Sequence, residues 1–123
     1  NIARGQLPAT FVAVLGGRYA GCVSLRGQTL GAVKHPELYG SGTPWLSNMW
    51  VAEWARGHGL AGALTARVMT TAQAMGFVRL YSSTATGSSL YHKMGFRTYA
   101  TRRFGDETIH LIEHDLAGAA VVS

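Results

Sequence analysis

The sequence predicts a mixed α/β (α+β) fold, in which a mostly antiparallel sheet carries two main helices. Two β-prone runs, residues 10–15 and 18–25, are joined by a pair of glycines. The apolar run 45–51 leads into a segment with helical periodicity, and two more β-prone runs follow at 96–104 and 108–115. The length of 123 residues suits one domain and is too short for two.

The first two runs are predicted to form an antiparallel hairpin. Gly16 and Gly17 between them can adopt the positive φ angles that a tight hairpin turn needs. The last two runs are expected to form a second hairpin around Gly105 and Asp106 for the same reason.

A strand, a helix and a second strand are predicted in the middle of the chain. The run 45–51 is too short and too apolar for a surface helix and is typical of a buried central strand. The helix that follows should bury one face, because apolar residues recur three or four apart at Leu60, Ala63, Leu64, Val68, Ala72 and Met75. Gly76 can end this helix. The next strand, 77–82, should be parallel to the first because a helix crosses over between them.

The segment 26–44 has no hydrophobic periodicity and is rich in glycine and proline. Loops of this length inside a compact domain are often functional. Two interpretations stay open, a wall of a binding site and a simple connector.

Composition narrows the function classes. Apolar residues make up 47% of the chain and charged residues 14%, which is typical of a globular protein. No apolar run approaches the roughly 20 residues that cross a bilayer, and no leader is visible, so no membrane partner is expected. The single cysteine, Cys22, has no partner for an internal disulfide, which fits a reducing cytoplasm. The five histidines lack metal-ligand spacing, so no metal is expected.

The net charge of +5 does not predict a nucleic-acid partner, because the basic residues are scattered. Only Arg102 and Arg103 are adjacent. A mildly positive field suits a polyanionic small molecule equally well. The domain is expected to act alone or as a homodimer.

A glycine turn stands between the run 45–51 and the long helix, in the stretch Arg56, Gly57, His58, Gly59, Leu60 and Ala61. The first turn of a helix offers backbone N–H groups without intrahelical partners, and the peptide dipoles add about half a positive charge there. Glycine lets phosphate oxygens approach the backbone closely. The turn therefore predicts a site for the diphosphate of an anionic cofactor.

A second motif lies about thirty residues further on. The stretch Leu90-Tyr91-His92-Lys93-Met94-Gly95-Phe96 is predicted to be a short helix that a glycine ends and a strand follows. In this order and spacing, the two segments resemble the GNAT superfamily of acetyl-CoA-dependent N-acetyltransferases. The resemblance implies a single GNAT-like domain over residues 1–123, in which the strand and two helices that usually precede the first hairpin are absent.

The resemblance implies acetyl-CoA as co-substrate, bound between the strands 45–51 and 77–82. In the family a β-bulge splays these two parallel strands, and the pantetheine arm lies in the gap. By position, Met49 and Val51 would supply backbone contacts to it. Residues 56–61 would hold the pyrophosphate, and Thr84 stands where many relatives have an asparagine that touches the pantetheine.

Tyr91 matches the tyrosine that, in the family, donates a proton to the departing thiolate of CoA. The alternative is a tyrosine that only packs on a helix face. In many relatives a glutamate on the central strand serves as the general base, but the run 45–51 has no ionisable residue. The base therefore stays open among Glu53, His35, Glu37 and His110.

Two functions follow from the resemblance. The first is transfer of an acetyl group from acetyl-CoA to a primary amine of a small molecule. The second is a catalytically silent CoA- or acyl-CoA-binding module, because the central-strand acid is missing.

Overall fold

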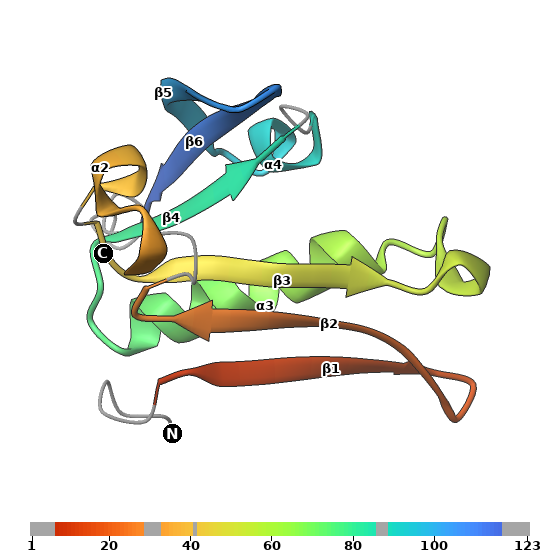
Figure 1. Cartoon of the computed structure of the whole chain (residues 1–123). Coiled ribbons are helices and arrows are strands. Elements are labelled where there is room, and N and C mark those ends of the chain that lie inside the picture. The colour runs from red at the N-terminus through yellow and green to blue at the C-terminus, as the bar shows by residue number, and fades with distance from the viewer. Residues whose placement is uncertain (1–6, 29–32, 41, 86–88, 117–123) are drawn as a thin grey trace.

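The computed structural model describes residues 7–28, 33–40, 42–85 and 89–116 (Figure 1). In chain order, its elements are β1 (Ala9–Leu15), β2 (Arg18–Arg26), α2 (Pro36–Tyr39), β3 (Trp45–Val51), η2 (Glu53–Ala55), α3 (Leu60–Ala74), β4 (Arg79–Thr84), α4 (Ser89–Lys93), β5 (Arg97–Phe104) and β6 (Glu107–Asp115). The strands form one sheet in the order β1-β2-β3-β4-β6-β5. Neighbouring strands are antiparallel except β3 and β4, which are parallel. The predicted mixed fold is confirmed.

Both predicted hairpins are present. In the turn between β1 and β2, Gly16 has φ 60° and Gly17 has φ 78°. Gly105 has φ 63° in the turn between β5 and β6. An added Cβ at these three glycines would meet no heavy atom within 4 Å, so the backbone conformation alone requires them.

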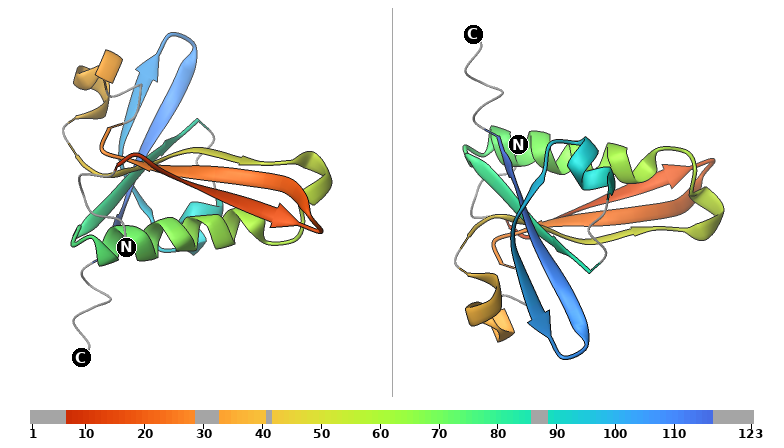
Figure 2. Two further views of the ribbon diagram at one scale, coloured as in Figure 1. Left: turned by 90° about the horizontal axis from the view of Figure 1, so that it is seen from below. Right: turned by 90° about the horizontal axis from the view of Figure 1, so that it is seen from above.

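The core lies between α3 and one face of the sheet (Figure 2). Leu64, Val68 and Ala72 of α3 are buried against strand residues, as the periodicity predicts. Ala63, which was expected on the buried face, is exposed. Thr65 is buried instead, and its hydroxyl donates to the Ala61 carbonyl at 2.8 Å, which satisfies the hydroxyl inside the helix. None of the described helices is long and apolar enough to span a membrane.

The strand β4 begins at Arg79, two residues later than predicted. The backbone N–H of Gly76 donates to the Gln73 carbonyl, and that of Phe77 donates to the Ala72 carbonyl. Phe77 therefore still closes the C-terminus of α3, with Gly76 at φ 89°.

The segment between β2 and β3 is anchored where it is described. It contains the helix α2, with Pro36 in its first turn, on the side of the sheet opposite to α3 and beside the β5–β6 hairpin (Figure 2). The ring of His35 lies 4.7 Å from that of Phe104. The indole N–H of Trp45 donates to the Gly42 carbonyl at 2.7 Å. These contacts make α2 one wall of the space described next.

Candidate active site

The parallel strands β3 and β4 meet at one end and then diverge. Trp45 and Tyr81 are in register, and the Tyr81 N–H donates to the Pro44 carbonyl at 3.0 Å. One residue further along, the Ser82 hydroxyl, and not a backbone N–H, donates to the Leu46 carbonyl at 3.0 Å. The side chain therefore bridges a gap that the backbones no longer close. The expected splay is confirmed.

A β-bulge in β3 lies beside this gap. Cys22 of β2 pairs with Trp50, whereas Ser24 pairs with Ser47, so β3 has one residue more than β2 between the two pairs. Asn48, within the bulge, has φ 57°, a left-handed conformation that asparagine tolerates better than most residues. A bulge bends its strand and increases the local twist, and the described pairing of β3 with β4 occurs before the bulge, at Trp45 and Tyr81.

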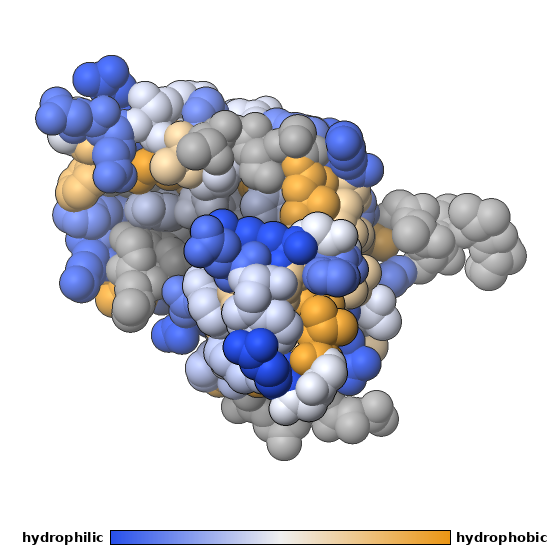
Figure 3. Space-filling view, turned by 90° about the vertical axis from the view of Figure 1, so that its right-hand side faces the viewer, coloured by the Kyte–Doolittle hydropathy of each residue, from blue (hydrophilic) through white to orange (hydrophobic). Residues whose placement is uncertain are grey.

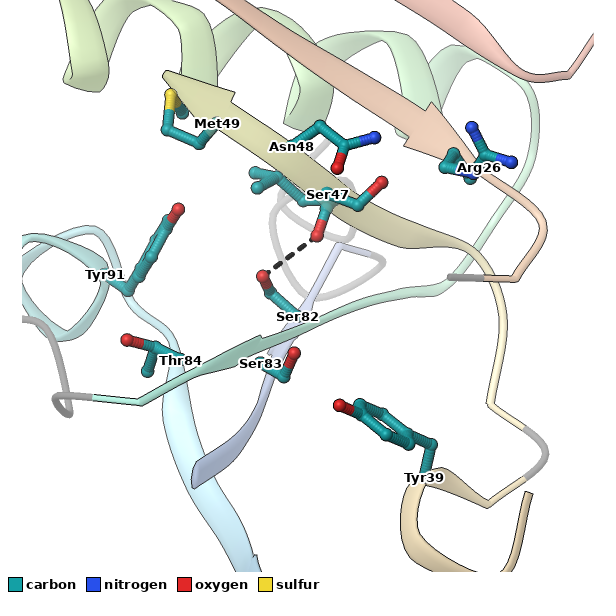
Figure 4. A pocket seen from close by; sticks show the side chains of 10 residues that line it. Arg26, Tyr39, Ser47, Asn48, Met49, Ser82, Ser83, Thr84 and Tyr91 are labelled. Atoms are coloured by element: carbon teal, nitrogen blue, oxygen red, sulfur yellow. Dashed lines mark hydrogen bonds between the residues drawn. The ribbon is translucent and has the colours of Figure 1, made fainter. Parts of the chain in front are cut away.

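A cavity of about 450 Å³ fills the gap between the diverging strands (Figure 4). It is lined by Arg26, Tyr39, Leu46, Ser47, Asn48, Met49, Ser82, Ser83, Thr84 and Tyr91. In Figure 4, Met49, Thr84 and Tyr91 lie at one end, and Arg26 and Tyr39 lie at the other. Three of the predicted site residues therefore line the same end of one cavity.

The glycine turn follows the C-terminal end of β3, and a second cavity of about 360 Å³ lies there. Its lining is Val51, Arg56, Gly57, Gly59, Leu60, Ala61, Gly62 and Leu90. The remaining predicted residue of the turn, His58, is exposed and does not line this cavity. Figure 3 looks onto this end of the molecule, where apolar surface forms small separate patches among polar residues.

The geometry of the turn suits an anion. Gly57 has φ 85° and Gly59 has φ 75°, and no atom of the residues that the structure describes lies within 4 Å of where either Cβ would be. Gly59 has no side chain to cap the N-terminus of α3, and no side-chain cap is found there in the described part of the chain, an arrangement that suits anion binding by the N–H groups of the first turn. Arg56 is held beside the turn by a hydrogen bond from its Nε to the Val51 carbonyl at 3.3 Å.

Tyr91 is almost completely buried in α4. Its ring contacts Phe96 edge-on at 5.5 Å, and its hydroxyl points into the first cavity (Figure 4). Burial raises the pKa of Tyr91 above its usual value of 10.0, so the hydroxyl keeps its proton at neutral pH. Gly95 ends α4 at φ 101°, and a Cβ there would lie 2.7 Å from the His114 ring, so this turn excludes larger residues.

The four candidate bases lie outside both cavities. Glu53 is exposed in η2, and His110 lies in β6. His35, the N-cap of α2, and Glu37, in its first turn, pair with each other at 3.5 Å. Among the described residues, the lining of the first cavity contains neither a carboxylate nor an imidazole.

The sequence interpretation missed several residues of the cavity, namely Leu46, Ser47, Asn48, Ser82 and Ser83. Arg26 and Tyr39 lie in the segment 26–44, which was a candidate wall of a binding site, but they were not named individually. The adjacent Ser82 and Ser83 carried a usable signal, because hydroxyls in a predicted buried strand need partners. The position of Arg26 and Tyr39 depends on how the 26–44 segment folds back over the sheet, which has no local sequence signal.

Comparisons with known proteins agree on one family. A family model described as acetyltransferase (GNAT) domain matches residues 7–98. No curated protein matches the chain in sequence. Among solved structures, the chain is similar to an IAA acetyltransferase from Bacillus cereus ATCC 14579, with 22% identity, 89% of this chain and 79% of that chain covered, and a TM-score of 0.67.

Two further structures show the same fold. A GNAT family acetyltransferase from Elizabethkingia anophelis with acetyl-CoA bound has 22% identity, 86% and 74% coverage of this and that chain, and a TM-score of 0.66. The ribosomal-protein-S18-alanine N-acetyltransferase from Escherichia coli has 18% identity, 92% and 72% coverage, and a TM-score of 0.70. The matched family model spans most of the sequence, and this chain therefore belongs to the GNAT acetyltransferases.

Proposed function

We propose that the chain transfers the acetyl group of acetyl-CoA to a primary amine of a small molecule. The observation that carries the proposal is the arrangement of the two cavities along β3. Met49 lines the cavity in the splay, and Val51, two residues on, lines the cavity at the glycine turn. One elongated ligand with a diphosphate near the turn can therefore follow β3 into the splay.

The glycine turn would hold the pyrophosphate through backbone N–H groups of residues 56–61. Gly57 and Gly59 leave open space where side chains would otherwise lie. Arg56 adds a positive charge that helps to balance a diphosphate. His58 contributes only its backbone in this proposal, because its side chain lies outside the cavity.

The pantetheine arm would pair with backbone groups of Met49 and Val51, as an added strand does. This part of β3 is open on the side of β4, because the described register pairing of the two strands stops at Trp45 and Tyr81. Thr84 faces the same space from β4.

A backbone N–H of β3 would polarise the thioester carbonyl in the splay, with no side chain required. The amine nitrogen forms a bond to the carbonyl carbon and loses a proton, while the carbon–sulfur bond breaks and the thiolate gains one. Tyr91 is the proton donor in this scheme. Its pKa lies above the value of about 8.5 for a thiol, so the proton transfer to the departing sulfur is uphill, and loss of the protonated thiol from the site has to draw the step forward.

The alternative, a silent CoA-binding module, is favoured by one observation, since the described lining of the splay contains no base. An amine with a pKa of about 10.4 is less than about 0.1% neutral at pH 7. The transferase must therefore take its nucleophile from this small neutral fraction, and its rate should increase with pH.

The experiment that separates the two functions measures thiol release from acetyl-CoA with a panel of primary amines, beside calorimetry of CoA binding. Amine-dependent release supports the transferase. Binding of CoA without release for any amine supports the module, and absence of both contradicts the proposed site.

A further inference from the structure

The charge of the first cavity is unusual for a site that receives an amine. Arg26, the last residue of β2, is the one charged residue among its described lining. An amine that is protonated before it reacts would meet this positive charge, and no described lining carboxylate offsets it.

The guanidinium of Arg26 is available to a ligand. Its Nε donates to the backbone carbonyl of Gln28 at 3.3 Å, and within residues 7–28, 33–40, 42–85 and 89–116 its two terminal nitrogens have no hydrogen-bond partner. No described carboxylate forms an ion pair with Arg26. A paired structural arginine would instead use its terminal nitrogens on an acid, as Arg97 does on Glu113 at 2.7 Å.

Hydroxyl groups surround the same end of the cavity. Arg26 pairs with Trp45 across the β2–β3 ladder and Ser24 pairs with Ser47, so Arg26 and Ser47 lie on one face of the sheet. The Ser47 Oγ is buried and has no hydrogen-bond partner among the described residues. Tyr39 of α2 lines the cavity on the side opposite to Arg26 (Figure 4). Buried hydroxyls normally have partners, so a ligand oxygen is a suitable one for Ser47.

We infer that the acceptor is an amine that also carries a carboxylate, and that Arg26 binds the carboxylate while the amine points along the cavity towards Met49 and Tyr91. A guanidinium fork matches the two oxygens of a carboxylate. In the reaction the carbon–nitrogen bond forms, the carbon–sulfur bond breaks, one proton moves from nitrogen to sulfur, and the carboxylate is unchanged. The inference rests on the proposed function and narrows its substrate class.

The probes are a panel of free α-amino acids and their α-carboxamides, which share side chains but differ in the carboxylate. Their amines differ in pKa, so each pair is compared between the native protein and Arg26→Gln. The variant should lose about 10- to 100-fold in kcat/KM for the acids, mainly through KM, because hydrogen bonds to charged groups are the stronger class. The carboxamides should change by less than about 3-fold by the same reasoning.

Arg26→Lys should recover part of the loss, since it keeps the charge and not the fork. Arg103→Gln removes the same charge from the exposed strand β5 and is the matched control. Equal losses for acids and carboxamides, or no loss for either, would overturn the inference while turnover itself upholds the proposed function. No turnover with any of these probes, while other primary amines are acetylated, would overturn the inference and leave the proposed function standing. No turnover with any primary amine, despite CoA binding, would contradict both.

Discussion

Trp45 of β3 and Tyr81 of β4 form the one register pair between these strands in the described part of the sheet, with ring centroids 5.6 Å apart. The indole N–H of Trp45 also donates to the Gly42 carbonyl, and Tyr39 contacts the same indole edge-on at 5.9 Å. Trp45 therefore contacts β4 at the point where the two strands begin to diverge, and it also contacts α2.

The first prediction concerns the bridge beyond this pair. Ser82→Ala removes the hydroxyl that donates to the Leu46 carbonyl, in a residue that is 2% exposed. The carbonyl then lacks this partner, so the free energy of unfolding should decrease by about 1–3 kcal/mol. Urea titration measures the change.

Ser83→Ala is the matched control, because Ser83 is the neighbouring serine and points to the other face of β4. Its effect should stay within about 0.5 kcal/mol. Equal destabilisation by both substitutions would show that the Ser82 bridge has no special part in holding the strands.

The second prediction concerns the glycine turn. Gly59→Glu places a carboxylate in the open space in front of α3 and should abolish measurable CoA affinity by filling the phosphate position and repelling it. The positive φ of Gly59 adds a strain of roughly 1 kcal/mol, so the fold should survive. Calorimetry gives the affinity and circular dichroism the stability.

Gly105→Glu is the control, because it makes the same change at another glycine with a positive φ, in the β5–β6 turn. There too, no described atom lies within 4 Å of the added Cβ. It should lower stability by a similar amount and leave CoA affinity unchanged. Retained affinity in folded Gly59→Glu would contradict the diphosphate site.

The elements that follow from local sequence were predictable. Both hairpins depend on glycines that only the turn conformation requires, and α3 follows from its apolar period. Periodicity could not predict that Thr65 is buried and Ala63 exposed. Thr65 tolerates burial because its hydroxyl finds a partner within the helix. The start of β4 was misplaced because Phe77 completes the helix cap.

The position of the glycine turn beside one cavity, and of Tyr91 beside the other, was predictable, since both lie in motifs contiguous in sequence. The opposite end of the first cavity was not. Arg26 and Tyr39 come from the segment that folds back over the sheet. Its position depends on contacts between residues far apart in the sequence, such as that of His35 with Phe104. The left-handed Asn48 likewise reflects the mismatch between β2 and β3, which no single strand reveals.

The third prediction concerns acid stability. The hydrogen bond from Arg79, at 2.7 Å, holds the pKa of Asp115 below its usual 3.8, and Arg97 lowers it further. The ionised form is therefore stabilised in the folded state, and its contribution is present above about pH 4 and lost as the pH falls further. The melting temperatures of the native protein and Asp115→Asn should thus converge as the pH decreases from 7 to 2.

A difference between the two melting temperatures that is constant over this range would contradict the role of the ion pair. Asp106→Asn, in the β5–β6 turn, controls for loss of one negative charge.

The last prediction is that Tyr91→Phe lowers turnover and leaves CoA affinity nearly unchanged. The ring and its contact with Phe96 are kept, and only the hydroxyl that points into the cavity is lost. General acid catalysis typically contributes about 10²- to 10⁴-fold, so kcat should decrease by that order. Because burial raises the pKa of Tyr91 above 10.0, the native hydroxyl is protonated between about pH 6 and 9, and the decrease in kcat should be the same throughout that range.

Tyr19→Phe, which removes a phenol hydroxyl at the surface, should keep native turnover. If Tyr91→Phe turned over at the native rate, the tyrosine would be a packing residue and the thiolate would take its proton from water.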